Sequence, residues 1–84
     1  MHHVYILLCG DGTLYCGYAK DIEQRLKLHL AGKGARYTRG RSPLTLVYSE
    51  TFTEKGLALK REYQIKQLSK SAKLTLIRTR KLAD

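Results

Sequence analysis

The side chains best suited to chemistry in this sequence are two tyrosines, an arginine and a histidine. Tyr5 and Tyr15 stand ten positions apart, and Arg25 and His29 stand four apart in a segment with helical spacing. Residues at i and i+4 lie on one face of a helix, so Arg25 and His29 project together. They project beside the apolar residues Ile22 and Leu26, so this polar pair is held by packing and is not free in water. The alternative is an ordinary arginine and histidine on a helix flank.

A fifth candidate, Glu62, occupies a second predicted helix. Three of the four residues that lie three or four positions from it are apolar, which places its carboxylate near the buried stripe. A carboxylate there needs a partner, because desolvating an unpaired charge is costly. Two interpretations stay open: an i,i+4 ion pair with Lys66, or an oxygen ligand for a hard divalent cation.

The tyrosines lie in a predicted β-hairpin. Residues 3–9 (HVYILLC) and 13–18 (TLYCGY) are rich in β-branched and aromatic residues, and Gly10-Asp11-Gly12 joins them. Both strands are apolar on both faces, so we expect them in the covered interior of a sheet.

The register of this hairpin decides whether the tyrosines meet. A two-residue turn would place Tyr5 and Tyr15 on opposite faces. A three-residue loop with Gly12 in the left-handed conformation pairs Cys9 with position 13 and brings both tyrosines and Gly17 to one face. We favour the second register. Gly17 would then lie opposite Tyr5 and leave a gap where a ligand could approach the backbone.

The remaining elements follow from caps and periodicity. Asp21 can cap a helix over residues 22–32, whose apolar stripe is Ile22, Leu26 and Leu30. A third strand is expected over 44–50. Thr53 can then cap a helix to about residue 68, and Ser69 or Ser71 a shorter one to about residue 80. The order β-β-α-β-α-α predicts an α/β (α+β) fold, with helices flanking a three-stranded, mainly antiparallel sheet in one domain over residues 1–84.

Charge points to a polyanionic partner. Sixteen Lys and Arg residues face seven Asp and Glu residues, for a net charge of +9. Several basic residues surround an aromatic one in the loop after the first helix: Lys33, Arg36, Arg39 and Arg41 around Tyr37. Arginines grip phosphates and a tyrosine can stack on an unpaired base, so we predict that this loop binds nucleic acid. The alternative is that Tyr37 packs at the core edge and the arginines are merely solvated.

Other classes are disfavoured. The longest apolar run has six residues, whereas a membrane span needs about 20, and the N-terminus does not resemble a cleavable signal. The two cysteines match no common zinc or disulfide pattern and suit a reducing compartment. We therefore expect a cytoplasmic protein that does not enter membranes.

Taken together, these residues resemble the GIY-YIG nuclease superfamily. The resemblance rests on Tyr5 within His3-Val4-Tyr5, on Tyr15-Cys16-Gly17, and on Arg25, His29 and Glu62 in that order. The stretches KGARYTRGRSPLTLVYSE and LALKREYQIKQLSK resemble its small stand-alone branch of uncharacterised proteins, so the likeness covers about residues 2–78. The sequence departs from the family where His3-Val4 replaces Gly-Ile, where Cys16 replaces isoleucine, and where the distal asparagine of larger members has no counterpart.

The resemblance implies metal-dependent hydrolysis of phosphodiester bonds. Glu62 would hold Mg²⁺, or Mn²⁺, and Arg25 would stabilise the pentavalent phosphate. Tyr5 would orient or deprotonate the attacking water, with Tyr15 hydrogen-bonded in the same cluster. His29 would accept a proton or position the water, and the choice of base between Tyr5 and His29 stays open.

The expected activity is an endonuclease of low sequence specificity, with DNA preferred over RNA. One alternative is a catalytically weak nucleic-acid-binding module that acts with a protein partner. A basic protein–protein adaptor is more remote.

Overall fold

The computed structural model describes residues 1–34 and 38–83. Its elements are the strands β1 (His2–Leu8), β2 (Leu14–Ala19) and β3 (Thr45–Phe52) and the helices α1 (Ile22–Leu30), α2 (Lys55–Lys66) and α3 (Lys70–Ala83). Along the chain they follow the predicted order β-β-α-β-α-α, and the α+β fold class is confirmed.

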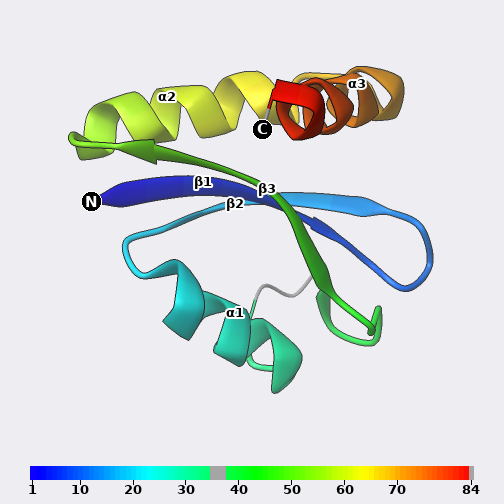
Figure 1. Cartoon of the computed structure of the whole chain (residues 1–84). Helices are drawn as coiled ribbons and strands as arrows, with labels where there is room; N and C mark the ends of the chain where they lie inside the picture. Colours follow the sequence, from blue (N-terminus) through cyan, green and yellow to red (C-terminus); the bar gives the residue numbers. More distant parts are fainter. Residues whose placement is uncertain (35–37, 84) are drawn as a thin grey trace.

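The three strands form one antiparallel sheet in the order β2-β1-β3. Figure 1 shows α2 and α3 on one face of this sheet and α1 on the other. Strand β1 is the central strand and β2 is an edge strand. Helices cover both faces of β2 while its outer edge stays unpaired, which is why its sequence is apolar on both faces and still allows an edge position.

The hairpin adopts the predicted three-residue loop. Tyr5 pairs with Gly17, and the N–H of Cys9 donates to the carbonyl oxygen of Thr13 at 2.9 Å. Gly12 has a φ of +84°, a left-handed conformation that glycine adopts without the clash of a Cβ atom. The turn therefore sets the register that places Tyr5 and Tyr15 on the same face.

Two apolar layers fill the space on either side of the sheet. On the side of α2 and α3, buried residues of all three strands pack against buried residues of α2. The strands contribute Val4, Ile6, Cys16 and Tyr48, and α2 contributes Ala58 and Ile65. On the side of α1, Tyr5, Leu7 and Ala19 are buried, and Ile22 and Leu26 of the helix pack against them. The alternating side chains of β1 thus divide between two cores, and the tyrosines belong to the α1 side.

Helix α1 has the predicted cap but a different buried face from the one expected. Asp21 caps α1, as predicted, and its carboxylate accepts from the N–H of Gln24 at 3.1 Å. Leu30, expected in the buried stripe, is 57% exposed, and His29 is buried in its place. Positions 22, 26 and 29 follow the 3.6-residue helical period more closely than 22, 26 and 30.

Of the predicted caps of the other two helices, one is wrong and one is confirmed. Glu54, not Thr53, stands at the N-cap position of α2. Ser69 caps α3, as one of the two predicted caps, since its hydroxyl accepts from the N–H of Ala72 at 3.1 Å. Within the described part of the chain, no helix is both long and apolar enough to cross a membrane.

Candidate active site

A chain of buried polar groups lies between α1 and the sheet. The Tyr5 hydroxyl and His29 Nε2 are 2.8 Å apart, and His29 Nδ1 lies 2.9 Å from the Thr38 hydroxyl. All three residues are only 2% exposed. Because a neutral imidazole donates from one nitrogen and accepts at the other, this chain gives the Tyr5 proton a defined route into the interior.

The second tyrosine completes an aromatic cluster around this chain. The Tyr15 ring centroid lies 6.3 Å from that of Tyr5 and 5.4 Å from that of His29. The two tyrosines therefore share one face of the sheet, as the predicted register requires. Tyr15 is the more exposed of the two.

Gly17 is needed for this arrangement in a way that differs from expectation. A Cβ atom at position 17 would lie 2.6 Å from the Tyr5 hydroxyl and 2.9 Å from the Tyr15 ring. We expected the missing side chain to admit a ligand to the backbone. The tyrosines themselves fill that space, so Gly17 admits the Tyr5 phenol beside β2.

Burial keeps the hydrogen-bonded pair neutral. Desolvation raises the pKa of Tyr5 to about 12, although the neighbouring Arg25 guanidinium works in the opposite direction. Desolvation and, secondly, the charge of Arg25 lower the pKa of His29 below its ordinary value. A neutral phenol beside a neutral imidazole is the protonation state from which a proton can pass from oxygen to nitrogen.

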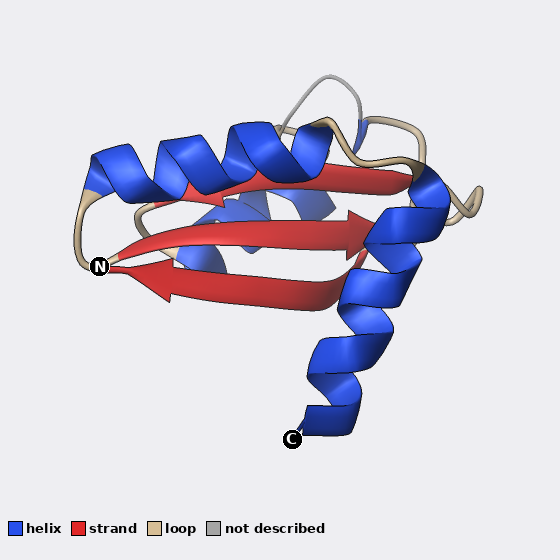
Figure 2. Ribbon diagram, turned by 90° about the horizontal axis from the view of Figure 1, so that it is seen from above, coloured by secondary structure: helices blue, strands red, loops and turns tan. Residues whose placement is uncertain are grey.

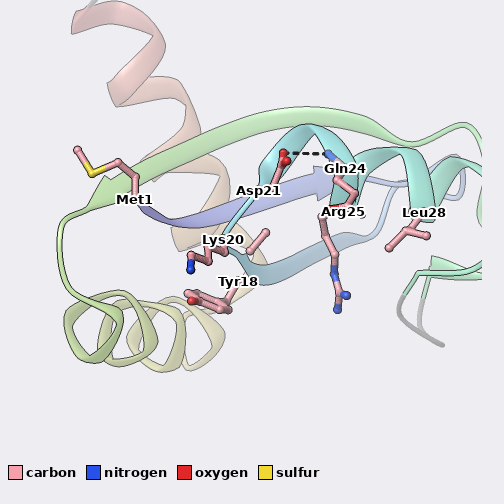
Figure 3. Close-up of a pocket in the computed structure, with 8 residues that line it drawn as sticks. Met1, Tyr18, Lys20, Asp21, Gln24, Arg25 and Leu28 are labelled. Atoms are coloured by element: carbon pink, nitrogen blue, oxygen red, sulfur yellow. Dashed lines mark hydrogen bonds between the residues drawn. The ribbon is translucent and has the colours of Figure 1, made fainter.

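Arg25 supplies positive charge beside this pair. Figure 3 shows its side chain extending from α1 toward the β2 edge. Its Nε atom is buried and has no hydrogen-bond partner among the described residues. A buried donor without an acceptor costs about 1–3 kcal/mol, so a group that supplied an acceptor there would be bound favourably.

Glu62 reaches the same strand from the opposite face of the sheet. Its side chain is 19% exposed and pairs with Lys66 at 3.4 Å, which is the i,i+4 ion pair that the sequence offered as one interpretation. Its backbone oxygen lies 4.0 Å from the Cys16 sulfur, so α2 packs against β2 at this point. Burial raises the pKa of Tyr15. The charges of Lys66 and Arg25 act in the opposite direction, and the charge of the Glu62 carboxylate adds to the rise. Helix α2 therefore packs on the face of β2 opposite the tyrosines, while the Glu62 carboxylate is close enough to affect the pKa of Tyr15.

The described basic residues of the predicted nucleic-acid-binding loop differ in their surroundings. Arg36 and Tyr37 lie outside the described residues, whereas Lys33 and Arg39 are exposed. The Arg41 guanidinium forms an ion pair with Asp11, and the Arg41 carbonyl accepts from the Gly10 N–H at 2.6 Å. Arg41 thus ties the loop to the hairpin turn.

Sequence reasoning missed Thr38 and Gly34. Thr38 hydrogen-bonds to His29, and a Cβ atom at Gly34 would collide with the His29 ring. Neither residue belongs to a helical or strand period that could have marked it. The only signal was their position in the short loop that follows the helix carrying His29.

A divalent cation would have a simple site here. Within the described ranges, no group of three or more His, Cys, Asp or Glu side chains is placed to hold a metal ion. Mg²⁺ commonly keeps several waters and binds one or two carboxylates together with substrate phosphates. The partly exposed Glu62 carboxylate at the β2 edge fits that pattern.

A family model described as the GIY-YIG catalytic domain matches residues 1–75. This chain belongs to the GIY-YIG family. The resemblance found in the sequence is confirmed, and the family is of the nuclease type, whose substrate class is nucleic acid.

Relatives of similar length support the small stand-alone branch. A UPF0213 protein from Halobacterium salinarum is 54% identical over 76 residues, which cover 90% of this chain and 99% of the relative. One from Staphylococcus saprophyticus is 57% identical over 76 residues, covering 90% of this chain and 93% of the relative. The solution NMR structure of a UPF0213 protein from Bacillus halodurans is 47% identical, with a TM-score of 0.62, and the match covers 93% of this chain and 83% of that one. The GIY-YIG fold of this chain is therefore also that of an experimentally determined relative.

Proposed function

We propose that this GIY-YIG protein is a metal-dependent endonuclease that hydrolyses phosphodiester bonds in DNA with low sequence specificity. The observation that carries the proposal is the buried hydrogen bond between Tyr5 and His29, with Arg25 beside it. Burying polar groups costs free energy that apolar packing would not, so their concentration beside one strand favours a chemical role.

Tyr5 and His29 act as one proton acceptor in this mechanism. With a pKa near 12, the Tyr5 phenol is a poor base by itself at neutral pH. As the attacking water gives its proton to the Tyr5 oxygen, the phenol proton passes to His29 Nε2, 2.8 Å away. In this mechanism the hydrogen of His29 is on Nδ1, which lies 2.9 Å from the Thr38 hydroxyl and donates to it, and this tautomer leaves Nε2 free to accept.

Arg25 and Tyr15 contact the phosphate. The guanidinium carries two-pronged donors that match phosphate oxygens, and its unpartnered Nε adds one more. Tyr15, more exposed than Tyr5, donates its hydroxyl toward the same group. Charge that develops on the phosphate in the transition state is then met by donors already in place.

Glu62 would hold the divalent cation, Mg²⁺ or Mn²⁺, at the β2 edge. A cation bound there would neutralise charge on the scissile phosphate and on the leaving oxygen. The Glu62 carboxylate pairs with Lys66 at 3.4 Å, so a cation would take over the charge compensation that Lys66 provides.

The loop after α1 contributes phosphate contacts outside the centre. Lys33 and Arg39 are exposed and available for this, and we keep Arg36 and Tyr37 as predicted contacts. Arg41 already has a carboxylate partner, so neutralising it alone would change the salt dependence of binding little. Phosphate contacts carry no sequence information, which accounts for low specificity in a protein that acts in the cytoplasm.

Cleavage assays on Glu62→Gln test the proposal. This change removes the charge of a metal ligand and keeps the shape of the side chain. We expect Mg²⁺- or Mn²⁺-dependent cleavage to disappear while the circular dichroism spectrum stays unchanged. Glu23→Gln is the matched control, because Glu23 is an exposed acid in the first turn of α1. Full activity of the Glu62 variant would remove Glu62 from the mechanism.

A catalytically weak binding module that acts with a protein partner is the second candidate. The Glu62–Lys66 ion pair favours it, because a lysine already compensates the carboxylate assigned to the metal. In that case Glu62→Gln would leave nucleic-acid binding intact, and the unmodified protein would not cleave DNA with either metal.

A further inference from the structure

The outer edge of β2 runs beside several groups of the candidate active site. Tyr15 and Gly17 lie within this strand, Arg25 reaches it from α1, and Glu62 lies on the helix that packs against Cys16. Strand β2 is an edge of the sheet, so its far side is not covered by another strand. A polynucleotide bound at the centre of this strand can continue along the uncovered edge toward either end.

Two lysines lie at the end of β2 nearest Ala19. An open hollow of about 680 Å³ is lined there by Tyr18, Lys20, Asp21 and Arg25, among others, and the Asp21 carboxylate accepts the capping hydrogen bond of α1. Figure 3 shows Lys20 and Tyr18 close together beside this hollow. The Lys55 ammonium lies 6.0 Å from the centre of the Tyr18 ring. Within residues 1–34 and 38–83, neither lysine takes part in an ion pair.

Positive charge is concentrated at this end. The imidazole of His2 stacks on Tyr18 and forms a 2.7 Å hydrogen bond with its hydroxyl. Desolvation and then neighbouring cations, Lys20 and Lys55 among them, lower the pKa of His2. Cations that disfavour one another and lack carboxylate partners form a site for an anion.

Two further lysines lie at the opposite end of β2. A smaller hollow of about 220 Å³ is lined by Thr13, Leu14, Lys70 and Lys73. Figure 2 shows α3 crossing the sheet at the hairpin end and extending past its edge. In the described part of the molecule neither of these lysines is ion-paired.

The length of β2, which separates the two lysine pairs, suits a polynucleotide. Leu14 and Ala19 are five residue steps apart, and a strand rises about 3.3 Å per residue, so the ends of β2 are about 17 Å apart. One strand of a DNA duplex places a phosphate every 3.4 Å along the axis, so about five phosphates span the same length.

We propose that a nucleic-acid strand lies lengthwise along the outer edge of β2, with Lys20 and Lys55 holding phosphates on one side of the active centre and Lys70 and Lys73 holding phosphates on the other. This inference rests on the proposed function for the identity of the centre. A strand held on both sides of the bond to be cut is cleaved internally, because neither end of the path is closed by the protein.

Salt-dependent binding of a DNA duplex tests the path. The variants are the pairs Lys20→Ala/Lys55→Ala and Lys70→Ala/Lys73→Ala, measured without metal so that no cleavage occurs. Each pair should reduce the slope of log K against log salt by about 1.8, since each lost phosphate contact contributes about 0.9. The control is Lys27→Ala/Lys60→Ala, two exposed lysines that stand two positions from Arg25 and Glu62 and hence on other faces of α1 and α2.

The control decides what a loss means. An unchanged slope in either test pair, or an equal loss in the control pair, would overturn the proposal, because binding would then depend on net charge and not on this path. Circular dichroism spectra establish that each variant is folded.

A chemical substitution in the DNA locates the contacts. A neutral methylphosphonate placed on one side of the cut should weaken binding by the unmodified protein. The same methylphosphonate should weaken binding tenfold less in the variant that has already lost the facing lysines. Equal effects in both proteins would overturn the assignment of that side. If the slopes fall as expected but no cleavage occurs with Mg²⁺ or Mn²⁺, the binding path stands and the proposed endonuclease function fails.

Discussion

Replacing Thr38 by valine should separate the role of the hydrogen-bonded chain from that of packing. Valine keeps the shape of threonine and removes only the hydroxyl that meets His29 Nδ1 at 2.9 Å. Both residues are 2% exposed, so water cannot replace the lost partner. An orphaned buried group of this kind costs about 1–3 kcal/mol.

That cost is large for a chain of this size. At 0.05–0.15 kcal/mol per residue, 84 residues give a free energy of unfolding of about 4–13 kcal/mol. A loss of about 2 kcal/mol lowers the Tm of such a domain by about 8–16 °C. Cleavage should fall as well, because the imidazole is no longer held in one tautomer.

Urea unfolding followed by circular dichroism measures the stability term. We expect the midpoint to fall with the slope m unchanged, and ¹⁵N chemical shifts of His29 should show that its tautomer preference has weakened. Thr38→Ser is the control, since it keeps the hydroxyl and loses only a methyl group. Equal stability and equal imidazole shifts in the valine and serine variants would refute the reasoning.

Three further predictions follow from the same region. The pKa of His29 is below 6.5 in the folded protein, so the unfolded chain binds more protons in acid. The free energy of unfolding should therefore fall as the pH drops below about 6.5, and it should fall less steeply in His29→Gln. The raised pKa of Tyr5, about 12 against an ordinary 10.0, stabilises the fold below pH 10, and about 2–3 kcal/mol should be lost as the pH rises to 12; urea titrations of Tyr5→Phe should lack that loss. In Gly17→Ala, the added Cβ would lie 2.6 Å from the Tyr5 hydroxyl and should destabilise the protein by about 1–3 kcal/mol. Gly56→Ala, in open space on α2, should instead stabilise it by about 0.5–1 kcal/mol, and a thermal melt that ranked the two glycine variants the other way would contradict the geometry.

The hairpin and the element order could be predicted because they depend on neighbours in the chain. Gly10-Asp11-Gly12 sets a three-residue loop, and the two-residue period of the strands then places Tyr5 and Tyr15 on one face. The four-residue spacing of Arg25 and His29 likewise predicts their common direction from α1. Turn chemistry and helical or strand periodicity act over a few residues, so the sequence contains them directly.

Tertiary structure alone decided how these side chains are partnered. Thr38 meets His29 across nine positions, and Arg41 meets Asp11 across thirty, which no local period predicts. The placement of Glu62 behind β2, on the face opposite Tyr5, depends on which side of the sheet α2 packs. Two apolar faces of a sheet are alike in sequence pattern, and the way the helices divide between them is settled only when the whole core is assembled.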